Sequence, residues 1–185
     1  MKQSAYGFVL FAFLALPPVA HFLESVMIMH MHMQMPLLVV VGFLMARYAQ
    51  LRWPGFFDKW NGNGIPGIVL FAIVVSYWML PRAMDESLES LGSELFKFIS
   101  LPFLAGVPLR DSWRKVSYVC KSTIFVGYMA VSVALGLLYT IAPVQLCNNY
   151  LLIEQITMGW GFLTTAICMA IYVIYHLMVR HSEYE

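Results

Sequence analysis

The chain of 185 residues is too apolar for a soluble domain of its size: 61% of its residues are hydrophobic, 11% are charged and the mean hydropathy is +0.73. The formal net charge of +1 gives no support to nucleic acid binding, which depends on clustered basic residues. We therefore predict an all-α fold: a polytopic transmembrane helix bundle that forms one integral membrane domain over residues 1–185, with the lipid bilayer as its first partner.

Six apolar stretches have about the length needed to cross roughly 30 Å of hydrocarbon. They cover residues 5–23, 26–46, 65–80, 88–109, 116–142 and 150–179. The first is expected to be a retained helix kinked at Pro17 and Pro18, not a cleaved signal peptide. The third is short and the fourth is interrupted by Glu94, Lys97 and Pro102, so a model with five spans stays open.

The basic residues predict the orientation, because cytoplasmic loops collect Lys and Arg. With the amino terminus inside, nine of the eleven Lys and Arg residues lie on the cytoplasmic side, and most acidic residues lie outside. Both termini are therefore predicted to be cytoplasmic, in a multi-pass protein of the inner or cytoplasmic membrane. Residues 53–67 contain repeated Pro-Gly and Asn-Gly turn signals, and we predict a cytoplasmic connector there.

Residues 27–35 read Met-Ile-Met-His-Met-His-Met-Gln-Met, an alternation of soft and borderline metal ligands. Thioether sulfur and imidazole nitrogen together suit copper, and Cu(I) in particular. At about 100° per residue on a helix, Met27, His30, Met31 and Gln34 share one face, while His32 lies almost opposite His30. An extended segment would align the histidines, but it would leave too few apolar residues to span the membrane. We therefore predict a helix that is kinked at Pro36.

Residues at the ends of other spans are predicted to lie at the same outer depth and to be further candidate ligands. They are His21 and Glu24 in the first span, Glu94 in the fourth, and Glu154 and Met158 in the last. Each has an alternative interpretation. Methionine is a common filler of membrane helices, Glu94 and Lys97 are spaced for an ion pair, a carboxylate at position 154 suits the start of a helix, and His21 has the position of an interfacial histidine.

Several short segments resemble one known family in order along the chain. They are His30-Met31 with Pro36-Leu37-Leu38 and Gly42, then Trp78 to Pro81, Phe103-Leu104-Ala105-Gly106 and Trp113, and finally Glu154-Gln155, Gly159-Trp160-Gly161 and Met169. From residue 24 onward the chain is similar to the CtaG-type cytochrome oxidase assembly-factor family. The family usually has a further histidine where Val26 stands, and a histidine pair where Glu94 and Leu95 stand nearby. The resemblance implies a membrane protein for oxidase assembly, and these departures imply a ligand set that differs from the family's.

Three functions follow from these observations. The first is a copper-binding membrane protein, with its site on the outer face, that acts in assembly or copper supply of a respiratory or other copper enzyme. The second is an electron-transfer subunit with copper or haem b, for which His21, His30 or His32 would be axial ligands. The third is an accessory subunit of a larger membrane complex without chemistry of its own. No residue is assigned a catalytic role.

Overall fold

The computed structural model describes residues 2–182, and it confirms an all-α fold: it is 85% helical, with no strand in this part of the chain. Three helices are long and apolar enough to cross a membrane by themselves. Three further pairs of helices pass the same test together, although each pair is bent at a short break. The described chain therefore has three to six candidate spans, which agrees with a multi-pass membrane protein.

The first bent pair consists of α1 (Lys2–Leu14) and α2 (Pro17–Glu24), which meet at an angle of 72°. The break lies where the sequence predicts a kink. Leu16 has extended backbone angles, because a residue that precedes proline is pushed out of the helical region. As a consequence, the chain turns at this point, and α2 packs against the start of the helix that follows it, residues 27–34.

The second candidate span is one continuous helix of 26 residues, built from α3 (Met27–Met29), η1 (His30–Gln34) and α4 (Met35–Arg52). Its η1 segment is a π-helical turn, in which the Met35 N–H donates to the His30 carbonyl five residues earlier. The predicted helix is present. Its irregularity near Pro36 is a π-helical turn over the preceding residues. Proline has no N–H to donate, so the wider turn lies where the regular ladder is already broken.

The predicted connector at residues 53–67 is partly helical, which corrects the expectation of a turn-rich loop. It contains α5 (Pro54–Trp60), which meets α6 (Ile65–Trp78) at 87°. Gly64 lies at the corner with a φ of 78°, a conformation that glycine adopts without strain. The turn signals in the sequence therefore mark this corner and not the whole segment.

The next bent pair joins α7 (Pro81–Glu89) at 117° to a helix made of α8 (Leu91–Ile99), η2 (Ser100–Gly106) and α9 (Val107–Trp113). This second π-helical segment packs against α4. The two backbones approach closely at Gly42 and Gly106: a Cβ atom on Gly42 would lie 1.9 Å from the carbonyl oxygen of Pro102. Small residues allow this kind of contact between membrane helices.

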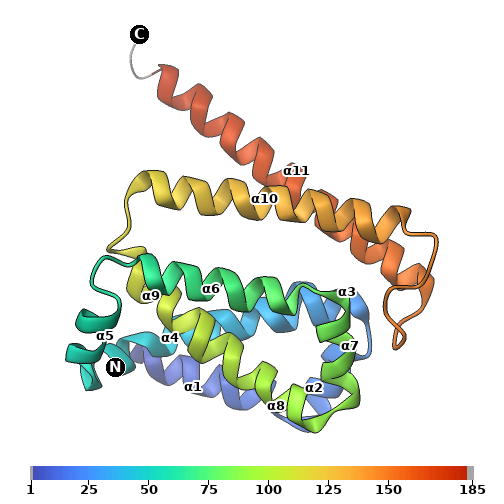
Figure 1. The fold of residues 1–185 in the computed structure, drawn as a ribbon, viewed down its shortest axis with the longest axis horizontal. Coiled ribbons are helices and arrows are strands. Elements are labelled where there is room, and N and C mark those ends of the chain that lie inside the picture. Colours follow the sequence, from blue (N-terminus) through green and yellow to red (C-terminus); the bar gives the residue numbers. More distant parts are fainter. Residues whose placement is uncertain (1, 183–185) are drawn as a thin grey trace.

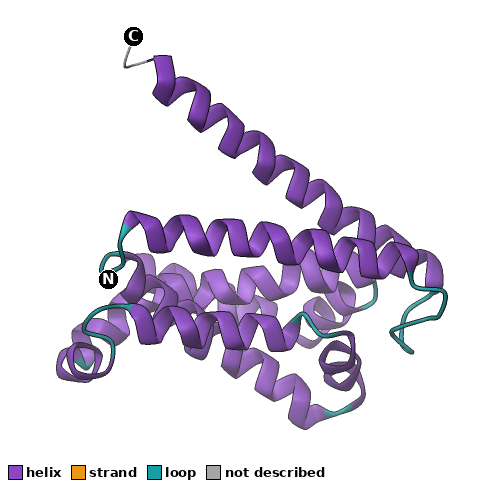
Figure 2. Cartoon of the chain, turned by 45° about the horizontal axis from the view of Figure 1, so that its top comes forward, coloured by secondary structure: helices purple, strands orange, loops and turns teal. Residues whose placement is uncertain are grey.

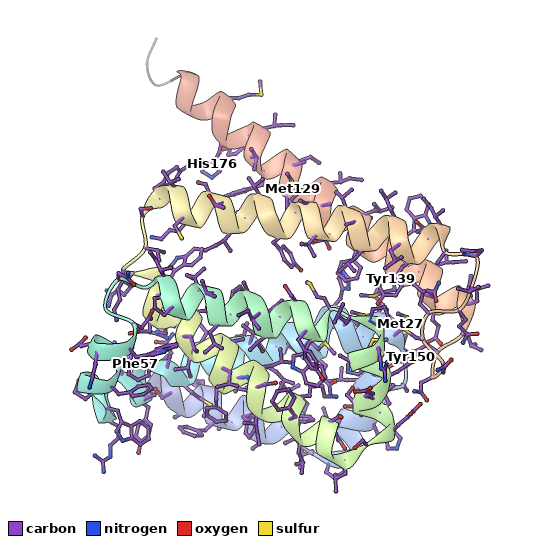
Figure 3. The ribbon with its side chains drawn as sticks, in the orientation of Figure 1. Met27, Phe57, Met129, Tyr139, Tyr150 and His176 are labelled. Atoms are coloured by element: carbon purple, nitrogen blue, oxygen red, sulfur yellow. The ribbon has the colours of Figure 1, made fainter. Side chains whose placement is uncertain are left out.

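The remaining helices, α10 (Tyr118–Ile141) and α11 (Leu152–Ser182), form a hairpin on one side of the bundle. In both views α11 crosses α10 obliquely and runs beyond it (Figures 1 and 2). The hairpin contacts α3, which carries the start of the Met/His run, and it also packs against η1. Met27, Tyr139 and Tyr150 lie together at one end of the bundle, whereas Phe57 lies at the other (Figure 3). We call the first of these the Met27 end.

Replacement of Gly42 by Ala tests the close crossing of α4 and η2. The added methyl group meets backbone atoms that have no side-chain freedom to move away. We expect the free energy of unfolding to fall by about 1 to 3 kcal/mol, the usual cost of overpacking. Gly127→Ala on α10 is the matched control, because nothing lies within 4 Å of its added Cβ. Thermal unfolding of both variants in detergent, followed by near-ultraviolet circular dichroism, measures the difference; equal stabilities would contradict the crossing.

Candidate functional site

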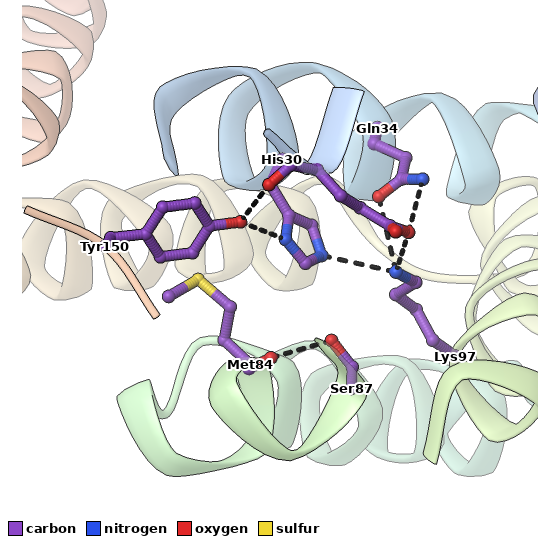
Figure 4. A network of polar contacts seen from close by, with 7 residues as sticks. His30, Gln34, Met84, Ser87, Lys97 and Tyr150 are labelled. Atoms are coloured by element: carbon purple, nitrogen blue, oxygen red, sulfur yellow. Dashed lines mark hydrogen bonds and ion pairs between the residues drawn. The ribbon is translucent and has the colours of Figure 1, made fainter. Parts of the chain in front are cut away.

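The centre of the candidate site is the side chain of Lys97, on α8, which is 0% exposed. Its Nζ atom lies 2.6 Å from Glu24 Oε1, 3.3 Å from His30 Nε2 and 3.4 Å from Gln34 Oε1. An ammonium group has three N–H donors and no acceptor. The three acceptors around Lys97 therefore use its whole donor capacity (Figure 4).

Two separate segments supply these acceptors, and a third, α8, supplies the ammonium group. Glu24 is the last residue of α2, and the backbone break before Pro17 lets α2 pack against η1. His30 and Gln34 begin and end η1, and residues four apart in a helix project from the same side. The bend between α7 and α8 leads into α8, and Lys97 in the last turn of α8 contacts them. The site therefore depends on the break before Pro17, the bend between α7 and α8 and one π-helical turn.

The hydrogen bonds determine the tautomer of His30. Because Lys97 donates to Nε2, the ring proton of a neutral imidazole must be on Nδ1. His30 Nδ1 lies 2.9 Å from the Tyr150 hydroxyl oxygen, so it donates to that oxygen. The Tyr150 hydroxyl in turn donates to the main-chain oxygen of Glu24, at 2.6 Å. Each donor in this chain of contacts has one acceptor, and both ring nitrogens of His30 are used.

Tyr150 comes from the loop between α10 and α11. Burial, together with the negative charge of Glu24, raises the pKa of its phenol above the usual range. The hydroxyl therefore stays protonated at neutral pH and acts as a donor. Tyr150 thus connects the loop of the α10–α11 hairpin to the Lys97 centre.

The charges of the centre balance. The Lys97 ammonium and the Glu24 carboxylate form an ion pair, and the Gln34 amide donates to the same carboxylate oxygen at 3.0 Å. Only the Glu24 side chain has contact with the exterior, at 12% exposure, while that of Lys97 has none. A buried ion pair survives only when good geometry and further hydrogen bonds offset the cost of desolvation. Here both conditions are met, and Glu24 is the member of the ion pair that connects the buried charge to the surroundings.

The predicted metal ligands of the Met/His run fall into two groups. His30 and Gln34 contact Lys97, whereas His32 lies elsewhere, as helical geometry predicts. Met27 is buried. The predicted place of Met31 on the face of His30 is wrong, because Met31 and His32 both lie toward the α10–α11 hairpin. The His32 ring packs on Phe162, with 4.7 Å between centroids. Met31 is also buried, and its sulfur lies 4.0 Å from the Tyr139 hydroxyl. The two histidines therefore belong to different environments.

Of the remaining candidates, only Glu24 joins His30. In the part of the chain that the structure describes, Lys97 pairs with Glu24 and not with the half-buried Glu94, which corrects the ion-pair interpretation of the Glu94–Lys97 spacing. Glu154 accepts a hydrogen bond from the Leu151 N–H at 2.9 Å, so it caps the start of α11. His21 is exposed on α2, and Met158 is buried in the core.

The Lys97 centre offers few side chains that could coordinate a metal ion. Over residues 2–182, no three or more His, Cys, Asp and Glu side chains converge as a metal site. A metal ion at His30 Nε2 would have to take the place of the Lys97 ammonium. The buried Cys147 thiol does not change this conclusion, because burial and the nearby Asp85 charge raise its pKa to about 12, which keeps it protonated.

Two residues of the centre were missed by sequence reasoning. In the sequence, Lys97 is interpreted as an interruption of the fourth apolar stretch and as a partner for Glu94, yet a lysine inside an apolar stretch is itself a signal of a functional site. Tyr150 carried no such signal, because loop tyrosines are common near membrane interfaces.

No family model, curated protein or solved structure matches this chain. The similarity to the CtaG-type family therefore stays a prediction.

The ion pair can be tested by a double-mutant cycle. Glu24→Gln leaves the buried Lys97 ammonium without its counter-charge, and we expect a loss of about 3 to 5 kcal/mol in the free energy of unfolding. Lys97→Met in the same background removes the unpaired charge and should recover a large part of that loss. Unfolding titrations in mixed micelles measure all four proteins. Additive effects of the two substitutions would show that the side chains do not interact.

Proposed function

We propose that this chain is a proton-coupled membrane protein in which the Lys97 centre binds and releases a proton. The observation that carries the proposal is an ammonium group with no exposure, held between a carboxylate and a neutral imidazole inside a helix bundle. Ionisable groups are costly within a membrane, and where they occur they commonly form proton relays or ion pathways.

The contacts support a definite order of events. Glu24 is the group with access to the exterior, so a proton enters there. Once the carboxylate is neutral, the Lys97 ammonium loses its counter-charge in a medium of low dielectric constant, where unpaired charge is unfavourable. The excess proton then has a path from Lys97 to His30 Nε2, its direct hydrogen-bond partner. The centre thus alternates between a net charge of zero and one of +1.

The direction of access follows from the distribution of Lys and Arg along the chain. The positive-inside rule places the Met27 end of the bundle at the outer face of the cytoplasmic membrane. Under this orientation Glu24 exchanges protons with the outer side. A conformational change or a partner subunit would use the proton that reaches His30.

A coupled titration of Glu24 and His30 tests the proposal. In the purified protein, infrared difference spectra report protonation of Glu24, and nitrogen-15 spectra report the protonation state and tautomer of His30. We expect both groups to change in the same pH step, because they share the Lys97 ammonium. The Nδ1–H tautomer should be present above that step.

Matched variants make this experiment specific. Glu24→Gln should remove the carboxyl signal and abolish the coupled change at His30. Glu86→Gln is the control, because Glu86 belongs to an exposed ion pair with Arg82 on α7 and should leave both signals unchanged. If His30 keeps one state while Glu24 titrates alone, the network is a structural connection and the proposal fails.

Copper binding is the second candidate, and the methionines around His30 favour it. Met27, three residues before His30 in the same helix, and Met84 are each 0% exposed, and Met84 reaches toward His30 and Tyr150 in Figure 4. A Cu(I) ion carries the same single positive charge as the ammonium group. In the place of that group it would keep the charge balance with Glu24 and have His30 Nε2 as a ligand, with thioethers as further soft ligands. Such a protein would hold or pass copper during assembly of a respiratory or other copper enzyme, as the CtaG-type resemblance implies.

Elemental analysis tests this candidate. We expect about one copper per chain in protein from copper-replete cells, loss of copper in His30→Ala, and normal copper in His21→Ala, since His21 is exposed and outside the centre. Lys97→Met should strengthen copper binding, because it removes the competing cation. Metal-free protein in all cases would exclude copper. A pyridine haemochrome spectrum of the same sample tests haem b, and absence of copper, haem and the coupled titration would leave an accessory subunit.

A further inference from the structure

A cavity of about 490 Å³ lies between the α10–α11 hairpin and the helices α4 and α6, apart from the Lys97 centre. Its volume falls in the range of small-molecule sites, about 300 to 1,000 Å³. The lining residues come from η1, α4, α6, η2, α10 and α11. Apolar and aromatic side chains make up almost all of the wall, and none of the lining residues has a fixed charge.

His32 is the distinctive polar group of this cavity. Its Nδ1 atom is buried and has no hydrogen-bond partner in the described part of the chain. Its Nε2 atom lies 3.5 Å from the Thr165 hydroxyl oxygen, but that hydroxyl donates to the Gly161 carbonyl at 2.9 Å. Buried polar atoms without a partner are rare in folded proteins, and each one suggests a missing water, ion or ligand group. His32 and Thr165 both line the cavity, so the side chain with the missing hydrogen bond belongs to its wall.

We propose that the cavity binds an isoprenoid quinone: a neutral, lipophilic molecule with a carbonyl-bearing ring. The aromatic side chain of Tyr128 provides an exposed surface for a flat ring, and the rings of Trp78 and Phe162 lie behind the wall. His32, with its ring proton on the partnerless Nδ1 atom, can donate a hydrogen bond to a carbonyl oxygen of the quinone. The apolar remainder of the wall accommodates the start of a prenyl tail.

The same wall excludes two other membrane ligands. A phospholipid headgroup brings a phosphate, and the cavity offers no cation to pair with it. Haem brings two propionates and meets the same difficulty. The acyl chain of a lipid is the remaining competitor, because it needs no polar partner at all, and the experiment below distinguishes it.

Binding of decyl-ubiquinone to the purified full-length chain tests the proposal. Trp78 lines the cavity, so a quinone bound there should quench its fluorescence. We expect saturable quenching at one quinone per chain, and loss of that signal in Trp78→Phe. Decylbenzene, which has a similar tail but no carbonyl group, should compete at least tenfold more weakly than the quinone.

Two further variants locate the binding. Val75→Phe fills the cavity from α6 and should weaken quinone binding at least tenfold, whereas Val69→Phe, on an exposed position of the same helix, should leave it unchanged. His32→Leu should weaken quinone binding about fivefold, the equivalent of one neutral hydrogen bond, with no effect on decylbenzene. Equal binding in Val75→Phe and Val69→Phe, or equal affinities for quinone and decylbenzene, would overturn the proposal in favour of simple partitioning or an acyl-chain site. Because the cavity does not include Lys97, Glu24 or His30, these results are independent of the proton titration.

Discussion

The structure depends most on the need to satisfy one buried charge. Lys97 has no exposure, and an isolated ammonium inside a bundle would cost several kcal/mol. The chain meets that cost with acceptors from α2 and η1, and the same acceptors link to Tyr150 beyond α10. A single lysine therefore connects segments that are distant in sequence. The requirement explains why Glu24, His30 and Gln34 must all be close to α8.

Irregular backbone makes this meeting of segments possible. The break before Pro17 turns α2 back toward η1, and the π-helical turn before Pro36 carries His30 and Gln34 to one side and His32 to another. The crossing at Gly42 and Gly106 then brings η2 against α4. Because η2 continues α8, this crossing also fixes the position of α8 relative to α4. Departures from regular helix and the functional groups thus occur in the same part of the bundle, as is common for π-helical turns.

Much of the fold could be predicted from the sequence, because hydropathy and proline are local signals. The apolar stretches, the kink at Pro17 and the separation of His30 from His32 agree with the structure. The helix α5 was missed, because Pro-Gly and Asn-Gly signals describe turns and say little about the few residues between them. The predicted partner of Lys97 was also wrong. A spacing of three residues favours Glu94, yet the actual partner is Glu24, 73 residues away in the sequence.

The sequence by itself determined the class of protein and the approximate positions of the apolar helices, since these depend on composition and on periodicity along one helix. Only the tertiary structure decided what surrounds each histidine. Partners such as Lys97 and Tyr150 come from other helices and loops, and their distances follow from bends and crossings that no local pattern specifies. The Met/His run thus keeps its functional interest, but its two histidines have different environments: His30 belongs to a balanced ionic centre, and His32 to the wall of an apolar cavity.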